Sequence, residues 1–230
     1  MKKPHLIVLL IFLFGVFQFQ STGLYIGRES VLNHSKTNAG LPQKPIGVSA
    51  TAFEHAIKGY RKLLKTVVVL SNDLLTVIDY SLPSNTERMW ILDMESNTVL
   101  KKSLVAHGRN SGELYAKKFS NEPGSYTSSL GFYRTGSTYQ GKHGLSLYLD
   151  GLEPGINDNA RLRAIVMHAA DYATDDFARQ NGRLGRSLGC PSIPPDDHSE
   201  VINLLAGGSC LFIYAPSEDY EKHSRVIQSP

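Results

Sequence analysis

The segment RLRAIVMHAADYATDDFARQNGRLGRSLGCP, residues 161–191, combines a strand-like apolar run with a glycine- and arginine-rich loop. Residues 164–167 form an apolar run that is followed directly by His168. Cys190 lies further along, at the end of the glycine- and arginine-rich loop. A strand end fixes a side chain while the adjoining loop leaves it open, which is a common place for catalytic groups. The pattern predicts a strand over Arg161–His168 and a short helix over Asp171–Gln180.

Strand-like runs lie on both sides of this segment. Helical spacing predicts a helix over residues 50–65, capped by Ser49, and another over Asp197–Leu205. Together the runs predict a mostly β domain with a few short helices over about residues 50–216. The expected strands are Thr66–Leu70, Leu74–Tyr80, Arg88–Met94, Thr98–Ala106, Leu130–Thr135, Leu145–Leu149 and Cys210–Tyr214.

The composition is that of an ordinary globular protein. Of the 230 residues, 41% are hydrophobic and 20% charged, with 20 Gly and 11 Pro, which excludes a mostly disordered chain, a collagen-like fibre and a multispanning membrane protein. The net charge is only +3, and no run of Lys or Arg exceeds two residues. No nucleic-acid partner is expected.

The N-terminus has the three parts of a secretory signal. Residues 1–23 contain a short basic end, an apolar run over Leu6–Phe17, and small residues before Leu24. A bilayer-spanning helix needs about 20 apolar residues, so cleavage is favoured over an uncleaved anchor. We expect a signal peptide over 1–23, a periplasmic or envelope location, and membrane contact only if the segment is uncleaved. Residues 24–48 are expected to be a linker and residues 217–230 a polar tail.

Cys190 is the strongest candidate nucleophile. Neighbouring glycines permit tight turns that bring backbone N–H groups toward the thiol, and Arg183 and Arg186 would favour a thiolate. The same residues are equally consistent with a structural cysteine or with a disulfide to Cys210. Cys210 itself lies in an apolar run and is expected to be a core residue.

The remaining motifs are few. His107 and His143 each precede a glycine in a loop, where either lines a pocket or belongs to a turn; His34, His55, His198 and His223 are expected to be solvated. The sequence has no nucleophile elbow, Walker loop, dinucleotide fingerprint or closely spaced Cys/His pair. No metal and no organic cofactor are expected.

Several ordered segments resemble the murein L,D-transpeptidase family, in the branch with Gly-Cys-Pro at its cysteine. The resemblance covers about residues 66–215. It is carried by LLTVIDYSLPS (74–84), VAHGRNSG (105–112), FSNEPGSYTSSLGFYRTG (119–136), GKHGLSLYLDGLEPGINDNARLRAIVMHAADY (141–172) and GRLGRSLGCP (182–191).

This resemblance implies a fold and a set of roles. The fold would be a mostly antiparallel L,D-transpeptidase-like β-sandwich, with a catalytic domain over residues 49–216. Cys190 would be the nucleophile and His168 the general base and acid. The backbone N–H groups of Gly189 and Cys190 would hold the oxyanion, and Ser187 would support the loop.

Other residues in the matched segments are expected to contact the substrate. These are Arg186, His143, Tyr126 and Arg134. The sequence also departs from the commoner family pattern: Leu188 replaces a histidine, Ser192 stands at a position that is usually polar or basic, and Ala169 replaces Gly or Ser. These changes bear on acceptor choice and pocket shape.

The expected function is acyl transfer on peptidoglycan stem peptides through a thioester, which forms 3→3 crosslinks or exchanges the terminal D-amino acid. One alternative is an L,D-carboxypeptidase or amide hydrolase on the same substrate. Another is a non-catalytic envelope-binding module stapled by a Cys190–Cys210 disulfide.

Overall fold

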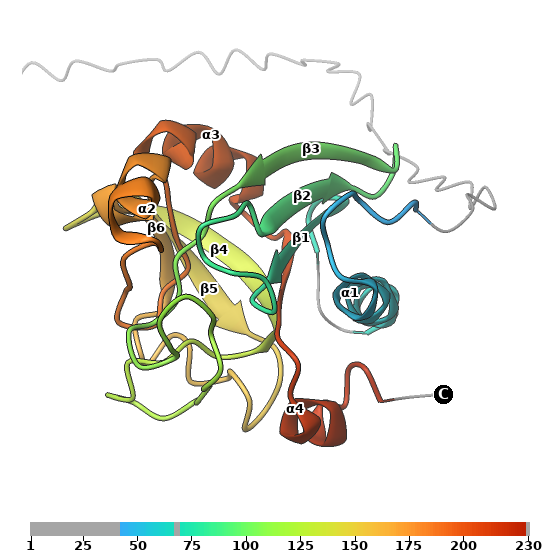
Figure 1. Cartoon of the computed structure of the whole chain (residues 1–230). Helices are drawn as coiled ribbons and strands as arrows, with labels where there is room; N and C mark the ends of the chain where they lie inside the picture. Colours follow the sequence, from blue (N-terminus) through green and yellow to red (C-terminus); the bar gives the residue numbers. More distant parts are fainter. Residues whose placement is uncertain (1–41, 67–69, 229–230) are drawn as a thin grey trace, which may run out of the picture. The chain divides into compact units, whose positions relative to one another are not determined.

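The computed structural model describes residues 42–66 and 70–228, which form a mostly β domain (Figure 1). The expected signal peptide, most of the expected linker and most of the expected strand Thr66–Leu70 lie outside the described residues. The strands are β1 (Leu74–Asp79), β2 (Met89–Asp93), β3 (Thr98–Ser103), β4 (Gly131–Gly141), β5 (Gly144–Gly151), β6 (Val166–Ala169), β7 (Ser192–Ile193) and β8 (Cys210–Tyr214). The helices are α1 (Ala50–Leu63), η1 (Asp171–Ala173), α2 (Asp175–Asn181), α3 (Pro195–Leu205) and α4 (Glu218–His223).

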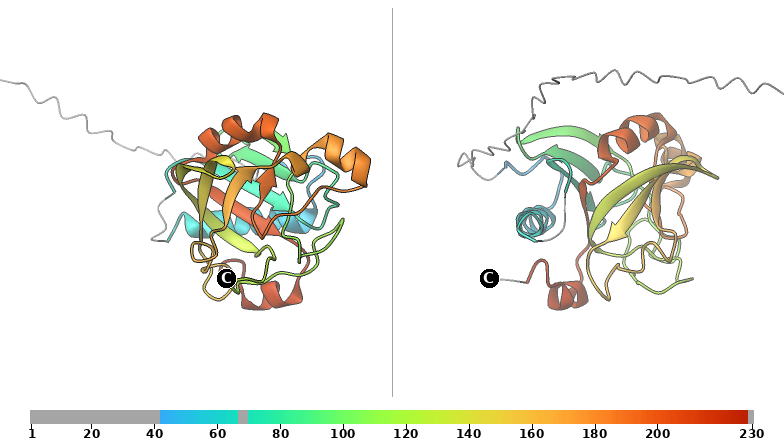
Figure 2. Two further views of the ribbon diagram at one scale, coloured as in Figure 1. Left: turned by 90° about the vertical axis from the view of Figure 1, so that its left-hand side faces the viewer. Right: turned by 180° about the vertical axis from the view of Figure 1, so that it is seen from behind.

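The strands form one mixed sheet in the order β3-β2-β1-β8-β4-β5-β6-β7. Neighbouring strands are antiparallel except for the pairs β1–β8 and β6–β7, which are parallel. The mostly β fold class is therefore confirmed. Figure 2 shows that β1–β3 and β4–β5 form two differently oriented parts of this sheet.

The core lies around β8, whose five residues CLFIY are all buried between β1 and β4. Helix α1 starts at the predicted cap, where Ser49 Oγ accepts a hydrogen bond from the backbone of Ala52. The helix packs tightly on β4, because a Cβ at Gly59 would lie 2.0 Å from the ring of Phe132. That ring stacks on Phe212 of β8 at 4.3 Å between centroids. The apolar strands thus give the sheet a rigid centre.

The C-terminal segment differs from the expected polar tail. Residues 218–223 form α4, and Tyr220 donates a 2.9 Å hydrogen bond to the buried carboxylate of Glu153. Val226 and Ile227 are buried in the main core. A few apolar side chains and one buried acceptor therefore hold a segment whose overall composition is polar.

Two local predictions near Cys190 also need correction. Residues 161–164 form turns rather than strand, and Ala164 has φ +53°, so β6 begins only at Val166. The predicted helix over Asp171–Gln180 is interrupted, because Thr174 is extended and caps α2 with its side chain. Among residues 42–66 and 70–228, no helix is long and apolar enough to cross a bilayer.

Candidate active site

The parallel pairing of β6 with β7 brings the two predicted catalytic residues together. His168 lies opposite Ser192 in the strand register, and Cys190 lies two residues before Ser192. The backbone N–H of Val166, at the start of β6, donates to Cys190 Sγ at 3.5 Å. His168 is 4% exposed and Cys190 is partly exposed. The site therefore combines a buried base with a partly exposed cysteine.

The thiol of Cys190 is protonated in its resting surroundings. Sγ–H donates to the carbonyl of Ala164 at 3.7 Å. Burial raises the pKa of the thiol, while the Val166 N–H, the Arg163 guanidinium and the backbone N–H of Cys190 partly oppose this shift. Because the net shift is upward, thiolate formation requires a base.

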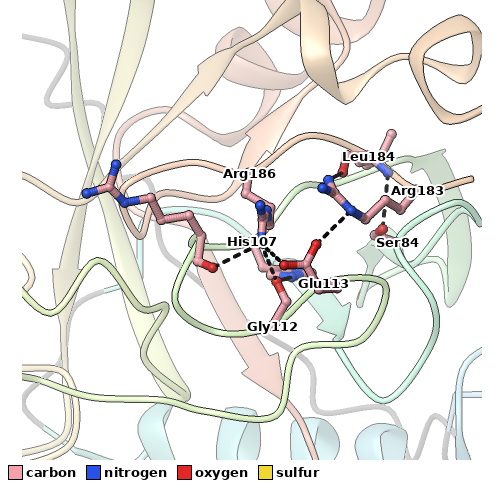
Figure 3. A network of polar contacts seen from close by, with 8 residues as sticks. Ser84, His107, Gly112, Glu113, Arg183, Leu184 and Arg186 are labelled. Carbon is pink, nitrogen blue, oxygen red and sulfur yellow. Dashed lines mark hydrogen bonds and ion pairs between the residues drawn. The ribbon is translucent and has the colours of Figure 1, made fainter. Parts of the chain in front are cut away.

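The cation near the sulfur is Arg163, which the sequence did not single out. Arg163 Nη2 donates to Thr127 O at 2.6 Å. This hydrogen bond holds the segment around Thr127 next to Gly189, the residue before Cys190. Arg183 and Arg186, expected to favour the thiolate, instead share the carboxylate of Glu113. Figure 3 shows Glu113 held between these two guanidinium groups. The single carboxylate of Glu113 therefore offsets one of these two positive charges, and both guanidinium groups are directed to Glu113.

Ser187 supports the cysteine loop through both of its hydrogen-bonding roles. Its Oγ donates to Cys190 O at 2.6 Å and accepts from Gly189 N–H at 3.0 Å. The expectation that Gly189 N–H would hold an oxyanion is therefore wrong for this conformation, since that donor is already used. The backbone N–H of Cys190, which lies beside its own sulfur, is the remaining candidate donor of the pair.

Gly189 has a conformational role instead. Its φ is +126°, and a Cβ there would lie 2.7 Å from Thr127 O and 2.9 Å from Ile165 Cδ1. Only glycine fits both this backbone angle and the close approach of the two segments. The residue thereby fixes where Cys190 stands relative to β6.

His168 is arranged as a neutral base. Its Nδ1 donates to Ala169 O at 2.8 Å, which leaves Nε2 as the acceptor nitrogen. Burial lowers the pKa of His168, and the nearby imidazoles of His143 and His198 lower it further, against the Ala169 contact. In the described chain, the ring and Cys190 Sγ are not hydrogen-bonded to each other; Ser192 Oγ lies 3.1 Å from Nε2.

The other expected contact residues divide between the site and the rest of the sheet. His143, in the turn between β4 and β5, stacks on His168 at 4.5 Å between centroids. Tyr126 lies under the guanidinium of Arg109, and the Arg109 backbone N–H donates to Ser187 O at 2.8 Å. His143 therefore lies beside the expected base, and Tyr126 lies in the surroundings of the cysteine loop.

Arg134 does not join this site. It pairs with Cys210 across β4 and β8, and its guanidinium lies against Gly208. Its expected role as a substrate contact stays a prediction, since the guanidinium lies near the turn that follows α3.

A family model described as the L,D-transpeptidase catalytic domain matches residues 44–214. The chain belongs to this family. No curated protein matches the chain. Fold similarity extends to the L,D-transpeptidase from Mycobacterium smegmatis, at 13% identity and TM-score 0.41, over 63% of this chain and 59% of that chain.

Two other solved structures show the same level of likeness. The helical cell shape determining protein Pgp2 from Campylobacter jejuni has 12% identity and TM-score 0.40, over 71% of this chain and 57% of that one. The Mycobacterium tuberculosis L,D-transpeptidase 1 has 13% identity and TM-score 0.36, over 63% of each chain. The chain thus spans less than two thirds of each of these structures, and the family assignment rests on the family model.

Both cysteines of this L,D-transpeptidase domain are free thiols. The Cys190–Cys210 disulfide considered from the sequence is therefore absent, and Cys210 is fully buried in β8. Burial alone raises the pKa of the Cys210 thiol. Among residues 42–66 and 70–228, no group of three or more His, Cys, Asp or Glu side chains could hold a metal ion.

Proposed function

We propose that this domain is a cysteine acyltransferase that acts on peptidoglycan stem peptides. The observation that supports this most directly is the contact of Cys190 Sγ with the backbone N–H of Val166 in β6, the strand that also carries His168. A nucleophile and a base held on adjacent backbone segments form the minimum arrangement for covalent acyl transfer.

The proposed first half-reaction forms a thioester. The thiol leaves the carbonyl of Ala164, and its proton passes to Nε2 of His168. Sulfur then attacks the carbonyl that joins the third residue of a tetrapeptide stem, a diamino acid, to the terminal D-Ala. The backbone N–H of Cys190 stabilises the tetrahedral oxyanion.

Collapse of this intermediate breaks the C–N bond. The D-Ala amine leaves with the proton that His168 Nε2 received, and the stem tripeptide remains bound to sulfur as a thioester. An amine from a second stem then attacks, and His168 accepts the amine proton and returns it to the departing thiolate. The product is a 3→3 crosslink, or an exchanged terminal residue when the amine belongs to a free D-amino acid.

Attack by water instead of an amine would give the carboxypeptidase alternative. The same residues perform both reactions, and the outcome depends on how well water is excluded from the thioester. The proposal requires no metal and no organic cofactor. We further propose that residues 1–23 direct the chain to the periplasm or cell envelope, with membrane contact only if they are not removed.

Incubation of the protein with a disaccharide-tetrapeptide, followed by mass spectrometry of the soluble products, tests this function. We expect D-Ala release together with a 3→3 dimer, and neither product from Cys190→Ala. D-Ala release with tripeptide alone would replace the transferase with the hydrolase. No D-Ala release from folded, reduced protein would contradict this substrate class.

A further inference from the structure

Two hydroxyl groups that the proposed mechanism does not use lie in series beside His168. Ser192 Oγ is 3.1 Å from Nε2, and Tyr172 Oη is 3.1 Å from Ser192 Oγ. Because Nδ1–H is given to Ala169 O, Nε2 accepts and Ser192 must donate to it. Ser192 Oγ in turn accepts from Tyr172. The three contacts define the place of each proton in the resting site.

The backbone fixes Ser192 from two sides. It pairs with His168 in the parallel register of β6 and β7, and its carbonyl accepts from Ala106 N–H at 2.8 Å. Ser192 is also fully buried. Its hydroxyl is therefore held at a set position against the imidazole.

Tyr172 is placed by the arginine-rich segment that precedes Cys190. Gly185 N–H donates to Tyr172 O at 2.8 Å, and a Cβ at Gly185 would lie only 2.4 Å from Tyr172 Cβ. A glycine at this position is needed for the tyrosine to lie so close. Gly185 therefore connects the segment before Cys190 to Tyr172, whereas the arginines of that segment pair with Glu113.

We propose that Ser192 and Tyr172 are positioning residues for the base, forming a hydroxyl chain that fixes the ring of His168 and follows its protonation state. The inference rests on the proposed function and adds two residues to it. In the resting enzyme the chain runs Tyr172 O–H to Ser192 O–H to Nε2.

The single lone pair of Nε2 cannot accept from Ser192 and from the thiol at once, so the Ser192 hydrogen turns away as the thiol of Cys190 protonates Nε2, and the chain reverses. Ser192 Oγ then accepts from Nε2–H, the serine hydrogen turns to Tyr172 Oη, and the hydrogen of the partly exposed Tyr172 turns away from Ser192. When Nε2 gives its proton to the leaving amine, the hydroxyls return. The chain carries no net proton, and no bond to carbon changes. The other titratable groups that influence the ring are His143 and His198.

A double-mutant cycle on D-Ala release distinguishes this role from simple packing. We expect Ser192→Ala to lower kcat about two- to tenfold, as for loss of one hydrogen bond, with KM unchanged and Ser192→Thr largely restoring the rate. Tyr172→Phe should lower kcat less, and should have no further effect in the Ser192→Ala background. Tyr115→Phe, which removes the hydroxyl of an exposed tyrosine, is the matched control and should leave kcat unchanged.

A second measurement is independent of the substrate. In Cys190→Ala protein labelled with ¹⁵N-histidine, Ser192→Ala should move the Nε2 resonance of His168 toward that of an unbonded imidazole nitrogen, and Ser192→Thr should not. Additive rate effects, or an Nε2 resonance insensitive to Ser192→Ala, would overturn the proposal. Wild-type protein without D-Ala release but with the expected Nε2 response would instead overturn the proposed function and retain the hydroxyl chain.

Discussion

The two cysteines of this domain carry the same group in opposite surroundings. Cys190 lies partly exposed on a loop, beside the N–H of Val166 and near Arg163, whereas Cys210 is fully buried at the start of the central strand β8. Polar neighbours oppose the effect of burial on the pKa of Cys190, and burial acts alone on Cys210. The comparison teaches that nearby hydrogen-bond donors and exposure to solvent determine whether a cysteine can act as a nucleophile or only packs in the core.

Replacing each cysteine with alanine should give the largest contrast. Cys190→Ala removes the nucleophile and should lower D-Ala release at least about 10³-fold, because residues that act as one catalytic unit fail together. Cys210→Ala should leave kcat close to that of the wild type at temperatures where the variant is folded. A comparable loss from both variants would remove the functional distinction between the two thiols.

Alkylation should separate the thiols without any substrate. With iodoacetamide under native conditions, Cys190 should react at least about 10²-fold faster than Cys210, which becomes accessible only when the fold opens. Because the pKa of Cys190 is raised above the ordinary thiol value of 9.0, its thiolate fraction and rate should still be increasing above pH 9.0. A rate that levels off near neutral pH would show instead that the pKa is lowered.

Two glycines with positive φ, Gly189 in the cysteine loop and Gly207 after α3, test whether the rate depends on the conformation of the cysteine loop. Gly189→Ala should lower D-Ala release about 10²-fold, since a Cβ would collide with Thr127 O and displace the adjacent nucleophile. Gly207→Ala is the matched control: its φ is +88°, but a Cβ there has no neighbour within 4 Å. It should cost only about 1 kcal/mol of stability from backbone strain and leave the rate unchanged. Equal rate losses would contradict the role assigned to the cysteine loop.

The smallest expected effect concerns the core thiol. Cys210→Ala should lower the free energy of unfolding by about 1 kcal/mol, and Cys210→Ser by about 2–3 kcal/mol, because serine buries a hydroxyl in apolar surroundings. Urea denaturation measures both values. A serine variant as stable as the alanine variant would show that the site offers the hydroxyl a partner.

Local patterns were sufficient for much of this account. Apolar runs located β1, β2, β4, β5 and β8, and the glycine-rich segment together with the family resemblance identified Cys190 and His168. These features are contiguous in the sequence and need no knowledge of pairing. The support that Ser187 gives to the loop was also expected from the family resemblance, and its partners lie within three residues.

What the sequence did not reveal depends on contacts between distant segments. Ser192 reaches His168 only because β6 and β7 are parallel and in a particular register, and Tyr172 is connected to the ring only through Ser192. Arg163 approaches the thiol through a turn that the apolar pattern misrepresented as strand. The position of the Arg134 guanidinium near Gly208 was also not revealed, because a matched motif does not show which way its strand directs a side chain. The C-terminal helix α4 was not predicted because its sequence is mostly polar, and only Tyr220 within it is buried.

The central claim is that Cys190, assisted by His168, forms a covalent thioester with a stem peptide. It is tested most directly by intact-mass analysis with peptide mapping of the protein after brief exposure to a disaccharide-tetrapeptide. We expect a transient adduct with the mass of the substrate minus D-Ala, located on Cys190, and a much slower appearance of that adduct in His168→Ala. An adduct located elsewhere, or D-Ala release that continues in Cys190→Ala, would contradict the claim.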